Sequence, residues 1–151
     1  MSEFDDFVAR KRAEIEARLA EQRQRETAAA KEAERIASLV QEFRRVDQAV
    51  ADAAARLNRK LEGIGVLSPE EAQERNTPDG AIAHIAARYK GGDAKPNEYA
   101  VLRFDLRKDN TVAAFIVASG PKKGALDMVA LTDCNATWIE RALEKFVQAV
   151  A

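Results

Sequence analysis

Three side chains in this sequence could bind a ligand or take part in chemistry. His84 is the only histidine and Cys134 the only cysteine of the 151-residue chain, and Arg103 offers a guanidinium group in a regularly patterned segment. An imidazole transfers protons near neutral pH, and a thiol at a helix N-terminus can become reactive. A lone histidine cannot form a histidine-based metal cluster, and a lone cysteine cannot form an intramolecular disulfide.

The neighbours of these residues favour ordinary structural roles. His84 lies among small apolar residues, and on a strand it would point outward together with Arg88. Cys134 stands between Asp133 and Asn135, either of which could cap a following helix, and the charge of Asp133 opposes ionisation of the thiol. The sequence therefore predicts no catalytic residue, no metal ion and no cofactor, and it favours a protein without enzymatic activity.

Two loops that contain lysine and glycine, residues 90–92 and 120–124, invite comparison with phosphate-binding loops. Neither opens a helix after a strand, and the second lacks both the Walker spacing and the Ser or Thr that should follow it. Both loops are better interpreted as turns between strands. No set of residues in the chain indicates a known family.

Glycine and proline divide the chain into two parts. All 7 glycines and all 4 prolines lie at position 63 or later. Connections recur roughly every dozen residues in a compact domain, so a long segment without either residue indicates one continuous helix. The predicted organisation is a helical segment, residues 1–63, followed by a small α+β domain, residues 64–151.

A heptad repeat runs through the predicted helix, which covers residues 3–62. Apolar side chains recur every seven residues from Val8, with a second series four residues further on. This 4-3 pattern is typical of a left-handed coiled coil, so we expect the chain to self-associate as a dimer or a tetramer. Asp47 falls in the seam, where full burial of its charge would be costly. The predicted interface consists of Ile36, Val40, Phe43, Val50, Leu57 and Leu61.

The first half of the helix has a weaker seam, because Arg12, Gln22 and Glu26 interrupt it. Residues 3–28 could therefore be packed loosely or lie free in solvent. A break near Glu26 would instead fold the segment into a helical hairpin, but no Gly, Pro or Asn marks a turn there. The continuous helix is the favoured interpretation.

The C-terminal part is predicted to contain three or four antiparallel strands. Apolar and polar residues alternate over 98–107, and residues 111–118 and 125–131 form apolar runs bounded by turn residues. Residues 81–89 fit either a helix or a strand, and the turns on both sides favour a strand. The predicted turns are residues 76–80, 108–110 and 120–124.

Helices are predicted on both sides of these strands along the sequence. Residues 68–71, a Ser followed by Pro and two Glu, form a helix-start signature that predicts one or two turns ending near residues 74–75. Residues 136–150 carry one apolar stripe, which includes Trp138 and Phe146, and predict an amphipathic helix that covers the sheet. The fold class is therefore α+β, with a long coiled-coil helix, a small antiparallel sheet and a C-terminal helix over the sheet.

Charge and hydropathy restrict the partners. The chain carries 24 basic and 25 acidic residues, and neither part has a basic excess, which argues against nucleic acid as a partner. The N-terminus lacks the pattern of a signal peptide, and no apolar run reaches about 18 residues. We therefore expect a cytoplasmic protein without a membrane partner.

Three functions remain open. The leading hypothesis is a non-enzymatic, homo-oligomeric scaffold that presents the α+β domain to a protein partner. The second is a ligand-binding or enzymatic domain with a pocket between the sheet and the C-terminal helix, to which His84 or Arg103 contributes. The third is an adaptor that binds a partner helix along residues 36–61. The pocket of the second hypothesis would be lined by Tyr89, Tyr99, Phe104, Phe115 and Trp138.

Overall fold

The computed structural model describes residues 2–74, 80–95, 98–117 and 124–151. The chain divides into two compact units, Met1–Ala37 and Ser38–Ala151. Helix α1 (Glu3–Phe43) contributes to both units, because Leu39 and Phe43 in its last turns are buried in the core of the second.

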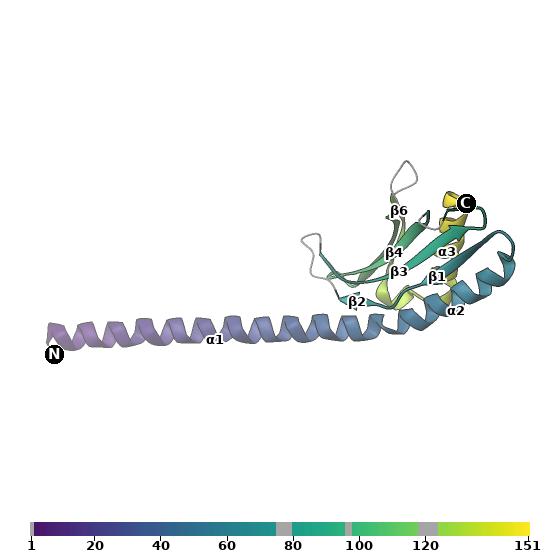
Figure 1. Ribbon diagram of the computed structural model, residues 1–151. Coiled ribbons are helices and arrows are strands. Elements are labelled where there is room, and N and C mark those ends of the chain that lie inside the picture. Colours follow the sequence, from purple (N-terminus) through teal and green to yellow (C-terminus); the bar gives the residue numbers. More distant parts are fainter. Residues whose placement is uncertain (1, 75–79, 96–97, 118–123) are drawn as a thin grey trace. The chain divides into compact units, whose positions relative to one another are not determined.

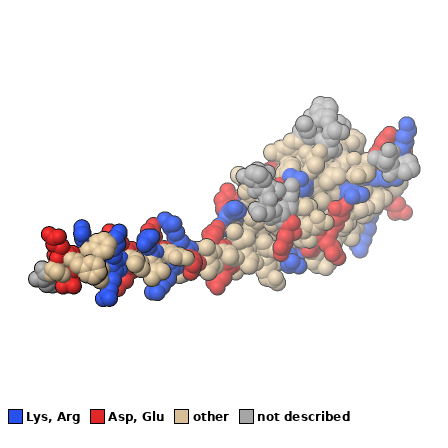
Figure 2. Space-filling view, turned by 60° about the vertical axis from the view of Figure 1, so that its left-hand side comes forward, with Lys and Arg blue, Asp and Glu red and all other residues tan. Residues whose placement is uncertain are grey.

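The first unit is a helical segment, residues 3–37 of α1. Ala, Glu, Arg and Gln dominate it, and these residues have high helix propensity. Acidic residues in the first turn complement the helix dipole, and ion pairs one turn apart, such as Arg25–Glu21 at 2.6 Å, add support. Basic and acidic side chains are interspersed along this helix (Figure 2), and none of its described residues is buried.

The second unit begins with the end of α1 and continues in α2 (Arg45–Lys60). The α-helical hydrogen-bond pattern is interrupted at Arg44, because the amide of Asp47 donates to the Arg44 carbonyl, only three residues earlier, at 3.2 Å. The φ of −61° and ψ of −25° at Arg44 stay in the helical region. Gly63 ends the helical segment with a left-handed φ of 83°. The predicted long N-terminal helix is therefore confirmed, with one interruption.

An antiparallel sheet of six strands forms the centre of the second unit within the described residues (Figure 1). The strands are β1 (Gly65–Pro69), β2 (Gln73–Glu74), β3 (Ala81–Gly91), β4 (Ala100–Arg107), β5 (Thr111–Ile116) and β6 (Gly124–Ala130). Their order is β1-β3-β4-β5-β6, and β2 pairs with a separate part of β3. The strand interpretation of residues 81–89 is confirmed, and the sheet exceeds the predicted three or four strands.

The remaining predicted strands are also present. The segments 98–107, 111–118 and 125–131 correspond to β4, β5 and β6. The predicted turn before β5 is present, and its Asn110 has a φ of 67°, which asparagine tolerates well. Residues 76–79 and 120–123 of the other two predicted turns lie outside the described residues, as does residue 118.

The helix predicted to start at residues 68–71 is wrong. Pro69 instead ends β1 opposite Ala87, and the amide of Glu70 donates to the Ala86 carbonyl at 2.8 Å. Gln73 then pairs with β3 as part of β2. A proline can occupy the end of an edge strand because no donor is needed there. Pairing with the long strand β3 therefore overrides a local helix signal.

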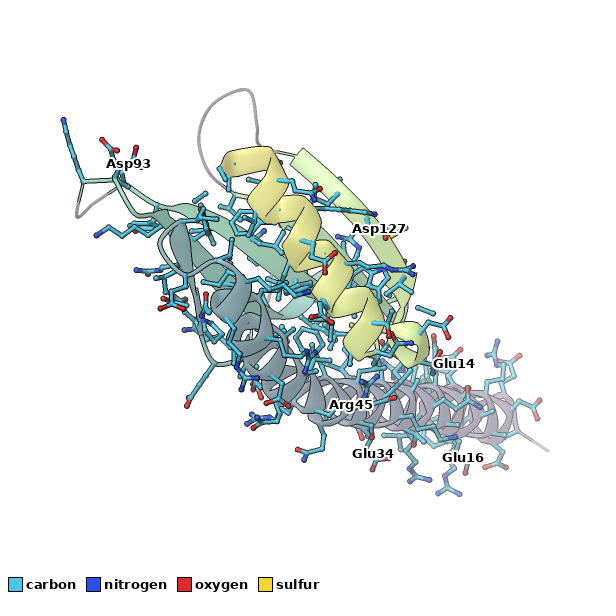
Figure 3. The ribbon with its side chains drawn as sticks, turned by 90° about the vertical axis from the view of Figure 1, so that its right-hand side faces the viewer. Glu14, Glu16, Glu34, Arg45, Asp93 and Asp127 are labelled. Carbon is cyan, nitrogen blue, oxygen red and sulfur yellow. The ribbon has the colours of Figure 1, made fainter. Side chains whose placement is uncertain are left out.

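Helix α3 (Ala136–Val150) begins where the sequence predicted it. The Asn135 side chain caps it by accepting the Trp138 amide at 3.0 Å, after a single 3-10 turn at Leu131–Asp133. Helices α2 and α3 contact each other and cover one face of the sheet (Figure 3). Fully buried side chains from both layers fill the space between them: Phe43, Val46, Val50, Leu102, Phe104, Leu106, Ile139, Leu143 and Phe146.

Two polar side chains of α2 hold neighbouring segments in place. The Asp47 carboxylate accepts the Ala72 amide at 2.8 Å, although desolvation raises the pKa of this aspartate. The Arg45 guanidinium donates to the carbonyls of Leu131 at 2.8 Å and Cys134 at 2.9 Å. The cost expected for Asp47 in the helix seam is thus offset by a partner within the same chain.

We predict that Arg45→Ala lowers the free energy of unfolding by about 2 kcal/mol, because two partly buried carbonyls lose a charged donor. Urea denaturation would measure the change. Arg59→Ala is the matched control, since Arg59 is an exposed α2 side chain, and it should shift stability by less than about 0.5 kcal/mol. Equal effects of the two substitutions would contradict the role assigned to Arg45.

Candidate functional site

The sheet face opposite the two helices carries the polar cluster of the second unit. Along β4, Leu102, Phe104 and Leu106 face the helices, so the intervening Arg103 and Asp105 lie on the other side. The β3–β4 register places His84 directly opposite Asp105. Two of the three predicted ligand candidates, His84 and Arg103, are therefore brought to one face, with Asp105 between them.

Arg103 neutralises the buried carboxylate of this cluster. Its Nε donates to Asp105 Oδ1 at 2.7 Å and its Nη2 to Oδ2 at 3.2 Å, a two-bond geometry that matches guanidinium to carboxylate. The Asp105 side chain is only 1% exposed, and a carboxyl group is costly to bury without such a partner. The guanidinium also lies 4.3 Å from the Phe115 ring centroid, a cation–π contact. Charge pairing and aromatic packing thus give Arg103 a structural role on this face.

Asp105 was not among the ligand candidates predicted from the sequence. Its position in an alternating strand, next to a turn, suggests an ordinary exposed residue. The available signal was its spacing of two from Arg103, which puts both side chains on one face of a strand. Its burial follows from neighbouring strands, which no local pattern shows.

Cys134 lies apart from this cluster, in the connection before α3. Its side chain is buried, and this burial raises the pKa of the thiol from 9.0 to about 11, against a smaller opposing effect of the Arg45 charge. The neighbouring Asn135, one of the two predicted caps, is the helix cap. A protonated, enclosed thiol is poorly suited to nucleophilic chemistry.

The space predicted to hold a pocket, between the sheet and α3, is occupied by side chains. Phe104 and Phe146 are fully buried there, and the Trp138 ring lies 6.0 Å from that of Phe104. The indole Nε1 of Trp138 donates to Asp127 Oδ2 at 3.0 Å, which satisfies its polar atom. The remaining predicted lining residues are elsewhere, since Phe115 lies on the opposite face and Tyr89 and Tyr99 line an open cleft.

The predicted oligomer interface is partly used within the chain. Phe43, Val50 and Leu57 are buried in the core of the second unit, whereas Ile36, Val40 and Leu61 are half-buried. Leu39 and Val46 are also buried in this core and make the apolar stripe wider than a coiled-coil seam. A stripe of that width is the sequence signal for docking onto a domain. Contacts of the half-buried residues with another chain stay a prediction.

The first unit retains a row of large apolar side chains that its own residues do not cover. The row consists of Phe4, Val8, Ile15 and Leu19, and Phe7 beside it is also exposed. Phe4 is 70% exposed and stacks on Phe7, with ring centroids 6.3 Å apart, while Ile15 and Leu19 are 47% and 46% exposed. At 3.6 residues per turn, Phe4, Val8, Ile15 and Leu19 fall within an arc of roughly 60°. This row is the candidate interaction site of the first unit.

Comparison with known proteins adds no relative. A scan against protein-family models and searches among curated proteins and solved structures found no match to this chain. Across the described residues, no three His, Cys, Asp or Glu side chains gather in a way that could hold a metal ion. In that same part of the chain, no helix is both long and apolar enough to cross a membrane.

We predict that Cys134 reacts with a thiolate-selective alkylating reagent at pH 8 at least about a hundredfold more slowly in the folded protein than in urea. The thiol pKa of about 11, against 9.0 when exposed, gives this factor before steric protection is counted. Because the folded pKa is raised, the neutral thiol favours folding, and its contribution is lost between pH 9 and pH 11. Mass spectrometry would follow the labelling, and equal rates in both states would refute the burial.

Proposed function

We propose that this protein is a non-enzymatic, homo-oligomeric scaffold of the cytoplasm, in which the N-terminal helices of several copies associate and present the α+β domain to a protein partner. The observation that carries the proposal is the row Phe4, Val8, Ile15 and Leu19 on one side of a helix that buries nothing within its own unit. Such a row is favourable only when another surface covers it.

The energetics of the row support association of helices. Burial of one large apolar side chain contributes about 1.5–3 kcal/mol, so several together can offset the cost of bringing two chains together. A narrow stripe with charged residues on both sides fits the seam of a coiled coil. Arg12, Gln22 and Glu26 lie in the same seam and weaken it, so the dimer or tetramer should be of moderate affinity.

Charge supports a protein partner for the assembled domains. The chain has 24 basic and 25 acidic residues, and the Arg103 charge is already paired with Asp105. Binding of a nucleic-acid backbone needs basic groups that can neutralise phosphates. The surfaces of the second unit fit a neutral or mixed-charge partner better.

One observation favours a second candidate, an adaptor that binds a partner helix. An open groove of about 370 Å³ lies between α2 and α3, with Leu57, Leu61 and Val147 among its lining residues and Lys60 and Glu144 at its sides. An apolar floor with charged sides suits an amphipathic helix. Glu144→Lys, which reverses the charge at one side of the groove, should weaken this binding without changing the mass of the homo-oligomer.

We predict that Ile15→Asp plus Leu19→Asp lowers the oligomer mass to that of the monomer at micromolar concentration, because two charges would enter the seam. Analytical ultracentrifugation of the full chain would measure the mass. Ala13→Asp plus Ala17→Asp is the matched control, with the same spacing and added charge on the opposite side of the helix. A monomeric wild-type protein, or equal masses for the two double variants, would refute the proposal.

A further inference from the structure

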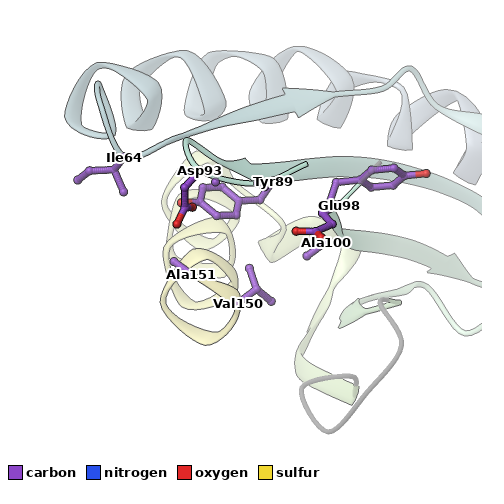
Figure 4. A pocket seen from close by; sticks show the side chains of 10 residues that line it. Ile64, Tyr89, Asp93, Glu98, Ala100, Val150 and Ala151 are labelled. Carbon is purple, nitrogen blue, oxygen red and sulfur yellow. The ribbon is translucent and has the colours of Figure 1, made fainter. Parts of the chain in front are cut away.

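We propose that an open cleft at the end of α3 binds an organic ammonium ion with a short apolar body. The cleft has a volume of about 430 Å³ and lies where β3 ends, β4 begins and α3 terminates (Figure 4). Its lining includes Ile64, Tyr89, Asp93, Glu98, Tyr99 and Val150. All of these residues belong to the second unit, so the proposal is independent of the association of the N-terminal helices.

The charged side chains among these lining residues are carboxylates, Asp93 and Glu98. Both side chains border the hollow in Figure 4. Glu98 lies within 3.5 Å of the Lys95 amide, so its carboxylate is held beside the cleft by the backbone. Two carboxylates at the rim of a partly enclosed space attract a cation more strongly than two in open solvent.

Tyr89 supplies a polar group in the wall of the cleft. The residue is only 4% exposed, yet its hydroxyl makes no hydrogen bond to any described residue. Because the cleft leaves this hydroxyl accessible, an N–H group of a bound ligand could donate to it. The aromatic ring next to the hydroxyl is also an attractive surface for a cation.

The backbone around the cleft is adapted to this tyrosine. A Cβ added to Gly65 would lie 2.6 Å from two ring carbons of Tyr89, so only glycine leaves room for the ring. The Gly92 amide donates to the Ile64 carbonyl at 2.8 Å and ties the end of β3 to the start of β1. The position of Tyr89 is therefore determined by neighbouring backbone.

Apolar side chains decide the class of cation. Ile64 is an exposed large apolar residue, and together with Val150 it forms a wall that water solvates poorly. A small, strongly hydrated metal ion gains nothing from such a wall, whereas methyl and methylene groups do. An alkylammonium ion combines the charge that the carboxylates attract with the carbon surface that this wall favours.

The test uses the full chain and three probes: n-butylammonium, tetramethylammonium and butyrate. Ligand-observed saturation-transfer NMR should show binding of both ammonium ions and much weaker binding of butyrate. Asp93→Asn plus Glu98→Gln should weaken the binding of both ammonium ions at least about tenfold, because two favourable charges are removed. Glu42→Gln plus Asp133→Asn, a matched pair of exposed carboxylates outside the cleft, should leave binding unchanged.

The Tyr89 hydroxyl is tested separately by Tyr89→Phe, which keeps the ring. Loss of this acceptor should weaken the binding of n-butylammonium, which carries N–H groups, about fivefold. Tetramethylammonium has no N–H group and should bind the variant as it binds the wild-type protein. Absence of saturation transfer to either cation, binding of butyrate as strong as that of the cations, or unchanged binding in the double carboxylate variant would overturn the proposal.

Discussion

Burial of one helical stripe against the sheet is the interaction on which the second unit depends. Phe43, Val46 and Val50 lie fully buried beneath the sheet, and α3 adds Phe146 to the same layer. A sheet of this size cannot leave its apolar face in water, so the helix end is committed to the domain core. Apolar side chains that are buried in this core are not available for contacts with another chain. The apolar positions still available for association are mostly those of the first unit.

Polar side chains of α2 then position the segments around this core. The Asn58 side chain makes the same pair of hydrogen bonds with the Leu67 backbone that a neighbouring strand would make. Its amide nitrogen donates to the Leu67 carbonyl at 2.9 Å, and its oxygen accepts the Leu67 amide at 2.7 Å. Two other side chains of α2 also bind backbone groups outside the helix. Asp47 accepts the Ala72 amide, and Arg45 donates to the Leu131 carbonyl. Each of these contacts satisfies a backbone group that a strand edge or a loop would otherwise leave without a partner. Helix α2 therefore stabilises the domain both by covering the apolar face of the sheet and by hydrogen bonds to neighbouring segments.

The sheet face opposite the helices and the cleft beside Tyr89 differ in how their polar groups are used. The open sheet face is stabilised by the Arg103–Asp105 pair, while the cleft beside Tyr89 keeps a hydroxyl and two carboxylates available. A cleft open to solvent binds a small cation only weakly by itself. The proposed oligomer would carry several such clefts, so a ligand with several linked ammonium groups would bind it more tightly than a single ammonium ion does.

The sequence by itself determined the elements with strong periodic or capping signals. These were the helix over residues 3–62, the alternating strand at 98–107 and the amphipathic helix behind Asn135. Tertiary structure decided what depends on partners distant in sequence. It placed residues 68–69 and 73–74 in strands because β3 offered an edge, and it buried Asp105 beside Arg103. Heptad spacing shows that a stripe will be covered, but a coiled coil and a domain core use the same spacing, so only three-dimensional packing separates them.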